Sequence, residues 1–111
     1  MNIGEVWWTR FPFEDTNELK TRPAIILDVD VLLVLSVRVT KHLPRDNDKH
    51  DIPILYWKDA KLKLASTARI SKTIPIPKRN FLNKIGELDT EDFDKVKTQY
   101  IKYLSESKQN K

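Results

Sequence analysis

The longest regular pattern in the chain is an alternation of side chains between Val31 and Thr40. One set of alternate positions holds only β-branched or leucine side chains, namely Val31, Leu33, Leu35, Val37 and Val39. Successive side chains of a strand point to opposite faces, so this period of two predicts a core strand. The other face begins apolar and ends on Ser36, Arg38 and Thr40. Those polar side chains either emerge into water or are presented to a ligand.

Shorter apolar segments between polar or proline-containing ones predict the remaining strands. We expect strands at residues 3–11, 22–29, 52–54, 66–70 and 73–76. Polar loops are predicted at residues 12–21 and 42–51, and a short helical connector at residues 78–84. Residues 56–62 form either one helical turn or an irregular bridge.

The end of the chain carries a helix pattern. Asp89 or Thr90 is the expected N-cap, and acidic residues follow in the first turn, where they oppose the helix dipole. Apolar residues then recur at helical spacing and predict a core-facing stripe: Phe93, Val96, Tyr100, Ile101 and Leu104. We expect residues 105–111 to fray. Short strands with one terminal helix predict a mainly β fold, a small curved β-barrel with a helix packed on it.

Length and composition place the chain among ordinary globular proteins. At 111 residues we expect one domain spanning residues 1–111, with a frayed polar tail from about residue 106. There is no run of about 18 apolar residues, and the N-terminus lacks the pattern of a secretory signal. With no cysteine, disulfides and thiolate chemistry are excluded. These features are compatible with the cytoplasm.

Basic residues gather in one part of the sequence. The formal net charge is only +4, but between Lys58 and Arg79 seven basic residues face a single acid, Asp59. The seven are Lys58, Lys61, Lys63, Arg69, Lys72, Lys78 and Arg79. This excess fits binding of a polyanion or an acidic peptide, and it fits a solvated lysine face equally well.

The loop at residues 42–51 contains two histidines and three aspartates. It lacks the glycine and glutamate that an EF-hand calcium loop requires. We therefore interpret it as a flexible surface loop and predict no metal site.

Arg22 precedes a proline at the start of a predicted strand. Pro23 has a fixed φ and pushes the preceding residue into an extended conformation. Arg22 is thus held stiffly at the foot of a strand. A single arginine in such a place is commonly a surface charge, so further evidence is needed to give it a role.

Several motifs in order resemble the MazF/PemK family of toxins from toxin–antitoxin pairs, over nearly the whole chain. They are Gly4-Glu5-Val6-Trp7-Trp8, Lys20-Thr21-Arg22-Pro23-Ala24-Ile25-Ile26-Leu27, the strand ending Val39-Thr40, Ser66-Thr67-Ala68-Arg69-Ile70, and Lys84-Ile85-Gly86-Glu87-Leu88 before the last helix.

The resemblance implies an SH3-like barrel, a homodimer, and endoribonuclease activity on single-stranded RNA without metal or cofactor. It also implies a cognate antitoxin with an acidic, partly disordered segment. The family pattern places the catalytic pair at Arg22 and Thr40, and we expect Lys20, Lys41 and Arg69 to line the RNA path. Arginine suits phosphate, and a threonine hydroxyl can donate to a phosphoryl oxygen.

The sequence departs from the family pattern in three places, one of which is the first loop, where Asp15-Thr16-Asn17-Glu18 has no counterpart of the serine or histidine seen in some relatives. Lys41 stands where many members have serine, and Ser71 where many have an acid that can act as base. The general base therefore stays unassigned, and His42 is a further possible RNA contact. Two alternatives remain open: a toxin of the same fold that inhibits DNA gyrase without catalysis, and a family member that has lost activity.

Overall fold

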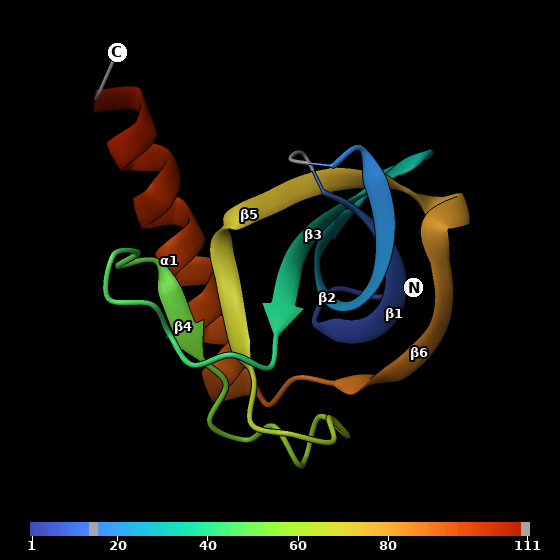
Figure 1. Ribbon diagram of the computed structural model, residues 1–111, viewed down its shortest axis with the longest axis horizontal. Coiled ribbons are helices and arrows are strands. Elements are labelled where there is room, and N and C mark those ends of the chain that lie inside the picture. The colour runs from blue at the N-terminus through green and yellow to red at the C-terminus, as the bar shows by residue number, and fades with distance from the viewer. Residues whose placement is uncertain (14–15, 110–111) are drawn as a thin grey trace.

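The fold is a six-stranded antiparallel sheet with one long C-terminal helix (Figure 1). The computed structural model describes residues 1–13 and 16–109. Its strands are β1 (Glu5–Phe13), β2 (Glu18–Val29), β3 (Leu33–Thr40), β4 (Asp51–Pro53), β5 (Thr67–Pro77) and β6 (Phe81–Glu87). A 3-10 turn, η1 (Lys78–Asn80), precedes β6, and the helix is α1 (Thr90–Gln109). The strand order is β4-β5-β3-β2-β1-β6.

The sheet curls without closing. Figure 1 shows β5 bending sharply and β6 returning around the far side, while α1 packs beside β4 and β5. Among the described strands, β4 pairs only with β5 and β6 only with β1, so the two sheet edges do not meet. The predicted mainly β fold with a C-terminal helix is confirmed, and its barrel is open.

Two apolar clusters stabilise the sheet. The larger one joins the sheet to α1 and the segment after β4, and its buried members include Val6, Ile25, Val37, Ile70 and Val96. The smaller one is built from Phe11, Ala24 and Ile76, with Phe13, Ile74 and Phe81 packed against it. Alternate residues of β1 and β2 therefore serve different clusters, as a strand period of two requires.

The observed strand β3 is shorter than the alternating pattern at residues 31–40 predicted. β3 begins at Leu33, and Val31 and Leu32 lie in the preceding connection with 78% and 75% of their surface exposed. The polar face also differs from expectation, because Ser36 is fully buried. Its hydroxyl donates to the Val34 carbonyl oxygen at 2.9 Å, which offsets the loss of water.

The prediction of a loop over all of residues 12–21 is wrong at both ends, while residues 14–15 lie outside the described part. β1 continues to Phe13 and β2 starts at Glu18, which is the Cα partner of Phe13. Glu18 and Lys20 are polar and were therefore predicted to lie in a loop. They lie on a strand that extends beyond the core, where polar side chains are exposed to water. Asn17 adopts a positive φ of 55° in the connection, a conformation that asparagine tolerates.

Two predictions need correction around β5 and β6, and one alternative can be decided. The strands expected at residues 66–70 and 73–76 form one bent strand, β5. Only residues 78–80 of the predicted connector are helical, and residues 81–84 belong to β6. Residues 55–61 form turns and no helix, which agrees with the irregular bridge predicted as one alternative for residues 56–62.

Gly86 marks a close backbone approach between β6 and these turns. A Cβ atom at this position would lie 2.3 Å from the Ala60 carbonyl oxygen. Gly86→Ala is therefore expected to lower the free energy of unfolding by about 2 to 3 kcal/mol, because backbone must move. Urea denaturation measures this, with the exposed Asn83→Ala as control. Equal stability of both variants would contradict the packing described here.

Helix α1 begins as predicted but presents a different stripe. The Asp89 Oδ1 atom accepts from the Glu91 backbone N–H at 2.9 Å, so Asp89 is the cap. The stripe that packs on the core is Phe93, Val96, Tyr100 and Tyr103. Ile101 and Leu104 are exposed, so placing them in the core stripe was wrong. The helix runs through Gln109, and residues 110–111 lie outside the described part, so fraying from about residue 106 stays a prediction.

A buried carboxylate fixes α1 to the segment after β4. The Asp92 Oδ1 and Oδ2 atoms accept from the backbone N–H groups of Leu55 at 3.0 Å and Tyr56 at 2.8 Å.

In the part of the chain that the structure describes, no helix has the length and apolar character needed to cross a membrane.

Glu5 links the N-terminus to β1 and β6. Its carboxylate accepts from the Asn2 backbone N–H and the Trp7 indole N–H, both at 2.9 Å, and lies 3.1 Å from the Lys84 ammonium. Burial alone would raise the pKa of Glu5, but these hydrogen bonds outweigh it and lower the pKa from 4.5 to about 2.

This arrangement predicts a stability that depends on pH. Because the folded-state pKa is lowered, the contribution of Glu5 is present above pH 4.5 and disappears as the pH falls toward 2. Glu5→Gln is expected to cost about 1 to 2 kcal/mol at pH 7. Thermal unfolding measured from pH 7 to pH 2 should show the two proteins converging at the acidic end. A difference that stays constant over this range would contradict the assignment.

Candidate nucleic-acid site

A cavity of about 440 Å³ lies where β2 and β3 separate. Its lining comes from β1, β2, β3, β6, residues 41–42 after β3 and residues 61–66: Trp8, Thr21, Arg22, Pro23, Val39, Thr40, Lys41, His42, Lys61, Leu62, Lys63, Leu64, Ser66 and Ile85. It therefore brings together three of the five residues singled out from the sequence, Arg22, Thr40 and Lys41.

The strand register explains why the cavity opens here. Ala24 and Arg38 are the last Cα partners of β2 and β3 at this end. Continued pairing would place Arg22 opposite Thr40, but the strands part at Pro23, which has no N–H to contribute. Beyond that point Arg22 pairs with Thr9 of β1 and Thr40 with Thr67 of β5. The two side chains thus lie on either side of a gap between neighbouring strands.

The cavity combines an apolar interior with positive charge. Its apolar lining includes Trp8, Leu62 and Ile85, whereas Arg22, Lys41, Lys61 and Lys63 supply cations, and none of its lining residues is acidic. A nucleotide has matching parts, because its base is a flat ring that stacks on aromatic side chains and its phosphate is an anion. The arrangement favours a single-stranded nucleic acid over an apolar ligand.

Thr40 and Arg22 both have donors left for a ligand. The Thr40 hydroxyl oxygen accepts from the His42 backbone N–H at 3.3 Å, which leaves its own proton free to be donated elsewhere. Arg22 donates through Nη1 to the Thr21 carbonyl oxygen at 2.7 Å and is otherwise exposed. A guanidinium has five N–H donors, so this bond leaves others available.

Lys20 lies outside the cavity, in a cluster of cations on an aromatic ring. Its ammonium is 4.9 Å from the centroid of the Phe13 ring, and the guanidinium carbons of Arg22 and Arg38 are 5.5 Å and 4.4 Å from it. Arg38 also lies 6.0 Å from the centroid of Phe11. Arg22 lines the cavity and also contacts the Phe13 ring. The cluster of Lys20, Arg22 and Arg38 on Phe13 therefore adjoins the cavity.

Arg69 is placed differently from the other sequence-predicted site residues. Its side chain is only 8% exposed, and its Nε atom lies 2.9 Å from Oδ1 of the buried Asp51 on the neighbouring strand β4. It does not line the cavity. A buried, paired arginine is held in the fold, so we do not retain Arg69 as an RNA contact.

Ser71 also has a structural partner. Its hydroxyl donates to the Asp48 Oδ2 atom at 2.6 Å. Burial would raise the pKa of Asp48, but this bond and that from the His50 backbone N–H lower it below its usual range. Ser71 therefore holds the loop between β3 and β4 against β5, and neither residue lines the cavity.

The same loop is tied to α1 at its far end. The His50 Nε2 atom lies 3.1 Å from a Glu106 carboxylate oxygen, its Nδ1 lies 2.8 Å from the Gln99 amide nitrogen, and Lys49 also pairs with Glu106. The loop at residues 42–51, predicted to be a flexible surface loop, therefore makes side-chain contacts with both β5 and α1. Across the described ranges no group of three histidine or acidic side chains is arranged to hold a metal ion.

Sequence reasoning missed the contribution of residues 61–66. Lys61 and Lys63 alternate with Leu62 and Leu64, so a segment without regular structure presents both cations and apolar side chains to the cavity. The basic excess between Lys58 and Arg79 was the available signal, but it did not distinguish these two lysines from the others. In the sequence, Trp8 was identified only as part of the motif at residues 4–8 and was given no role in the site.

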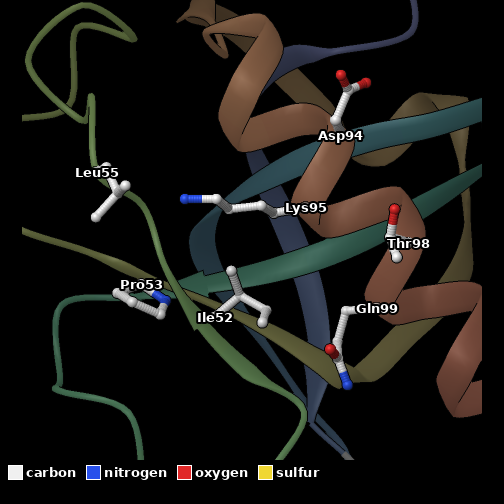
Figure 2. Close-up of a pocket in the computed structure, with 7 residues that line it drawn as sticks. All are labelled: Ile52, Pro53, Leu55, Asp94, Lys95, Thr98 and Gln99. Atoms are coloured by element: carbon white, nitrogen blue, oxygen red, sulfur yellow. The ribbon is translucent and has the colours of Figure 1, made fainter.

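A second cavity, of about 400 Å³, lies between β4 and α1 (Figure 2). Its lining is Ile52, Pro53, Leu55, Asp94, Lys95, Thr98 and Gln99. The charges of Asp94 and Lys95 offset one another, and it contains none of the sequence-predicted site residues. We therefore assign the candidate site to the first cavity.

Comparison with known proteins agrees with this fold. A solved MazF from Deinococcus radiodurans superimposes with a TM-score of 0.76 at 15% identity, covering 95% of this chain and 96% of that one. A mycobacterial endoribonuclease solved in complex with its cognate antitoxin gives 0.70 at 14% identity, covering 95% of each chain. The Mycobacterium tuberculosis toxin MazF-mt6 gives 0.66 at 18% identity, covering 86% of this chain and 91% of that one.

Sequence comparison defines the family. Curated proteins include no similar sequence. The model of the PemK-like, MazF-like toxins of type II toxin–antitoxin systems matches residues 2–104, which is nearly the whole chain. With the open barrel, the terminal helix and the cavity between β2 and β3, the chain belongs to the PemK-like, MazF-like toxin family.

Proposed function

We propose that this protein is an endoribonuclease toxin that cleaves single-stranded RNA without a metal ion. The observation that carries the proposal is the cavity lined by both Arg22 and Thr40, where β2 and β3 separate. Family membership supports the same activity, because a solved relative of this fold is described as an endoribonuclease. We expect the protein to act in the cytoplasm.

The proposed reaction uses the ribose 2′-hydroxyl as the nucleophile. Its oxygen forms a bond to phosphorus as its proton leaves, and the bond from phosphorus to the 5′-oxygen breaks as that oxygen takes up a proton. The products are a 2′,3′-cyclic phosphate and a 5′-hydroxyl. Arg22 stabilises the added negative charge, and the Thr40 hydroxyl donates to a phosphoryl oxygen. Because the nucleophile belongs to the substrate, this route requires no metal ion.

The other lining residues hold the RNA strand. Lys41 with Lys61 and Lys63 contacts phosphates around the cavity, and Trp8 offers a surface on which a base can stack. Lys20 extends the positive surface along β2. His42 lines the cavity and has a side chain of the type that most often transfers protons.

We further propose a homodimer that a cognate antitoxin neutralises. Solved relatives with this fold include a mycobacterial endoribonuclease and a Deinococcus radiodurans MazF, each in complex with an antitoxin. The cations around the cavity would attract an acidic, partly disordered antitoxin segment as well as RNA.

The reaction is tested by the chemistry of its product ends. An RNA oligonucleotide incubated with the protein in EDTA should give a fragment ending in a 2′,3′-cyclic phosphate. A single 2′-deoxy substitution on the 5′ side of the cut should abolish cleavage at that position only. Cleavage that survives this substitution would exclude the proposed nucleophile.

A further inference from the structure

The backbone of His42 is bonded to two threonine hydroxyl groups. Its N–H donates to the Thr40 Oγ1 atom at 3.3 Å, and its carbonyl oxygen accepts from the Thr67 Oγ1 atom at 2.7 Å. Thr40 is the last residue of β3 and Thr67 the first of β5, and the two are direct Cα partners. Residues in this relation lie on the same face of a sheet. The backbone of His42 thus links two hydroxyl groups that lie on one face.

Thr67 is the rigid end of this link. It is only 2% exposed, and it is paired in register with Thr40 on one side and with Pro53 of β4 on the other. A side chain on a strand is held more precisely than one on a loop. Thr67 is not among the residues that line the cavity, so it can influence a substrate there only through the residues that it holds.

The link constrains the hydroxyl group of Thr40. A hydroxyl hydrogen rotates about its C–O bond, and its direction is set by the partners of the oxygen. Because the Thr40 oxygen accepts from the His42 N–H, the Thr40 proton must point away from that amide. A donor that is oriented before the reaction stabilises developing charge better than one that must first reorient. The bond from Thr67 keeps the His42 backbone in place for this task.

A buried hydroxyl group needs a partner in any protein, so a bond of this kind can also serve stability alone. Thr73 on the same strand is an example, because its Oγ1 atom donates to the Ile70 carbonyl oxygen at 2.7 Å and it does not line the cavity. Thr67 differs from Thr73 in one respect. Its acceptor belongs to the residue whose N–H is bonded to Thr40.

We propose that Thr67 positions the Thr40 hydroxyl for RNA cleavage, acting through the backbone of His42. Thr67 is a positioning residue and does not contact the substrate. The inference rests on the proposed action on RNA, and it gives a role in that action to a buried side chain outside the cavity.

The variant Thr67→Val removes the hydroxyl group and keeps the shape of the side chain. We expect the single-turnover rate of RNA cleavage to fall roughly 10-fold, less than in Thr40→Ala, because the Thr40 donor remains but is poorly oriented. The protein concentration that gives half of the maximal rate should not change, since Thr67 does not contact RNA. Thr67→Ser retains the hydroxyl group and should restore most of the rate. Circular dichroism establishes that each variant is folded.

Two comparisons decide whether the effect passes through Thr40. Adding Thr67→Val to Thr40→Ala should lower the rate by less than about 2-fold, because no hydroxyl group is left to orient. The matched control Thr73→Val should leave the rate of the wild-type protein unchanged. An equal loss of rate in Thr73→Val, or a full further loss in the double variant, would overturn the inference.

A measurement without RNA separates this inference from the proposed reaction. The amide proton chemical shift of His42 in NMR spectra reports its hydrogen bond to Thr40. Thr67→Val should move this shift in the same direction as Thr40→Ala, and Thr73→Val should leave it in place. If the shift moves as expected but the wild-type protein cleaves nothing, the link from Thr67 to Thr40 stands and the nuclease proposal fails. If the shift does not move, the inference is wrong even when the wild-type protein cleaves RNA.

Discussion

Replacing Arg22 by alanine is expected to lower kcat for RNA cleavage by at least about 100-fold, because the charge that develops on phosphorus loses its main cationic partner. Arg22 is exposed, and its one described hydrogen bond goes to the neighbouring Thr21 carbonyl oxygen, so its removal should leave the fold intact. Single-turnover cleavage of a labelled RNA oligonucleotide measures the effect.

Two control variants sharpen this prediction. Arg22→Lys retains the charge but loses the planar pair of donors, so it should recover only part of the rate. Arg10→Ala removes an exposed arginine from the adjacent strand β1 and should leave the rate unchanged. Normal activity in a folded Arg22→Ala protein would remove Arg22 from the site.

Replacing Asp51 by alanine is expected to be the most damaging change to stability, at about 3 to 5 kcal/mol. The Arg69 guanidinium would keep its charge in a buried place without the carboxylate 2.9 Å away. A loss of this size is a large part of the stability of a small domain. Chemical denaturation measures it, and Asp59→Ala, which removes an exposed acid, is the control.

A double variant distinguishes a structural Arg69 from an RNA-binding one. Asp51→Leu combined with Arg69→Met removes both charges and should recover much of the lost stability, as replacing buried ion pairs often does. RNA cleavage by this double variant should be close to that of the wild-type protein. A stable double variant with greatly weakened RNA binding would return Arg69 to the RNA path.

The sequence predicted the parts of this molecule that depend on local pattern. The alternation before Thr40 identified the central strand, and the residues around Asp89 identified the start of α1. These features involve residues close together in the chain, so propensity and periodicity are sufficient. Both strands of the β1–β2 hairpin were predicted, but their extension into residues 12–13 and 18–21 was missed because Glu18 and Lys20 are polar residues on a strand that extends past the core.

The site was predicted only where a family motif covered it. Arg22 and Thr40 lie together because pairing of β2 with β3 stops at Ala24, and no sequence pattern reports that register. Arg69 was placed on the RNA path because nothing local reveals its burial beside Asp51. In the sequence, Lys61 and Lys63 could not be told apart from the other basic residues. Their place in the cavity depends on the conformation of the turns after β4.

The most direct test incubates the purified protein with a long single-stranded RNA in EDTA and maps the 5′ ends of all fragments. We expect discrete cuts at a short recurring motif, reduced on the order of 100-fold in Thr40→Ala, because that variant lacks one donor to the phosphoryl oxygen. Uncut RNA from a folded wild-type dimer would contradict the proposed activity. It would favour a family member that binds its target without catalysis, and an assay of DNA gyrase supercoiling would then identify an inhibitor of that enzyme.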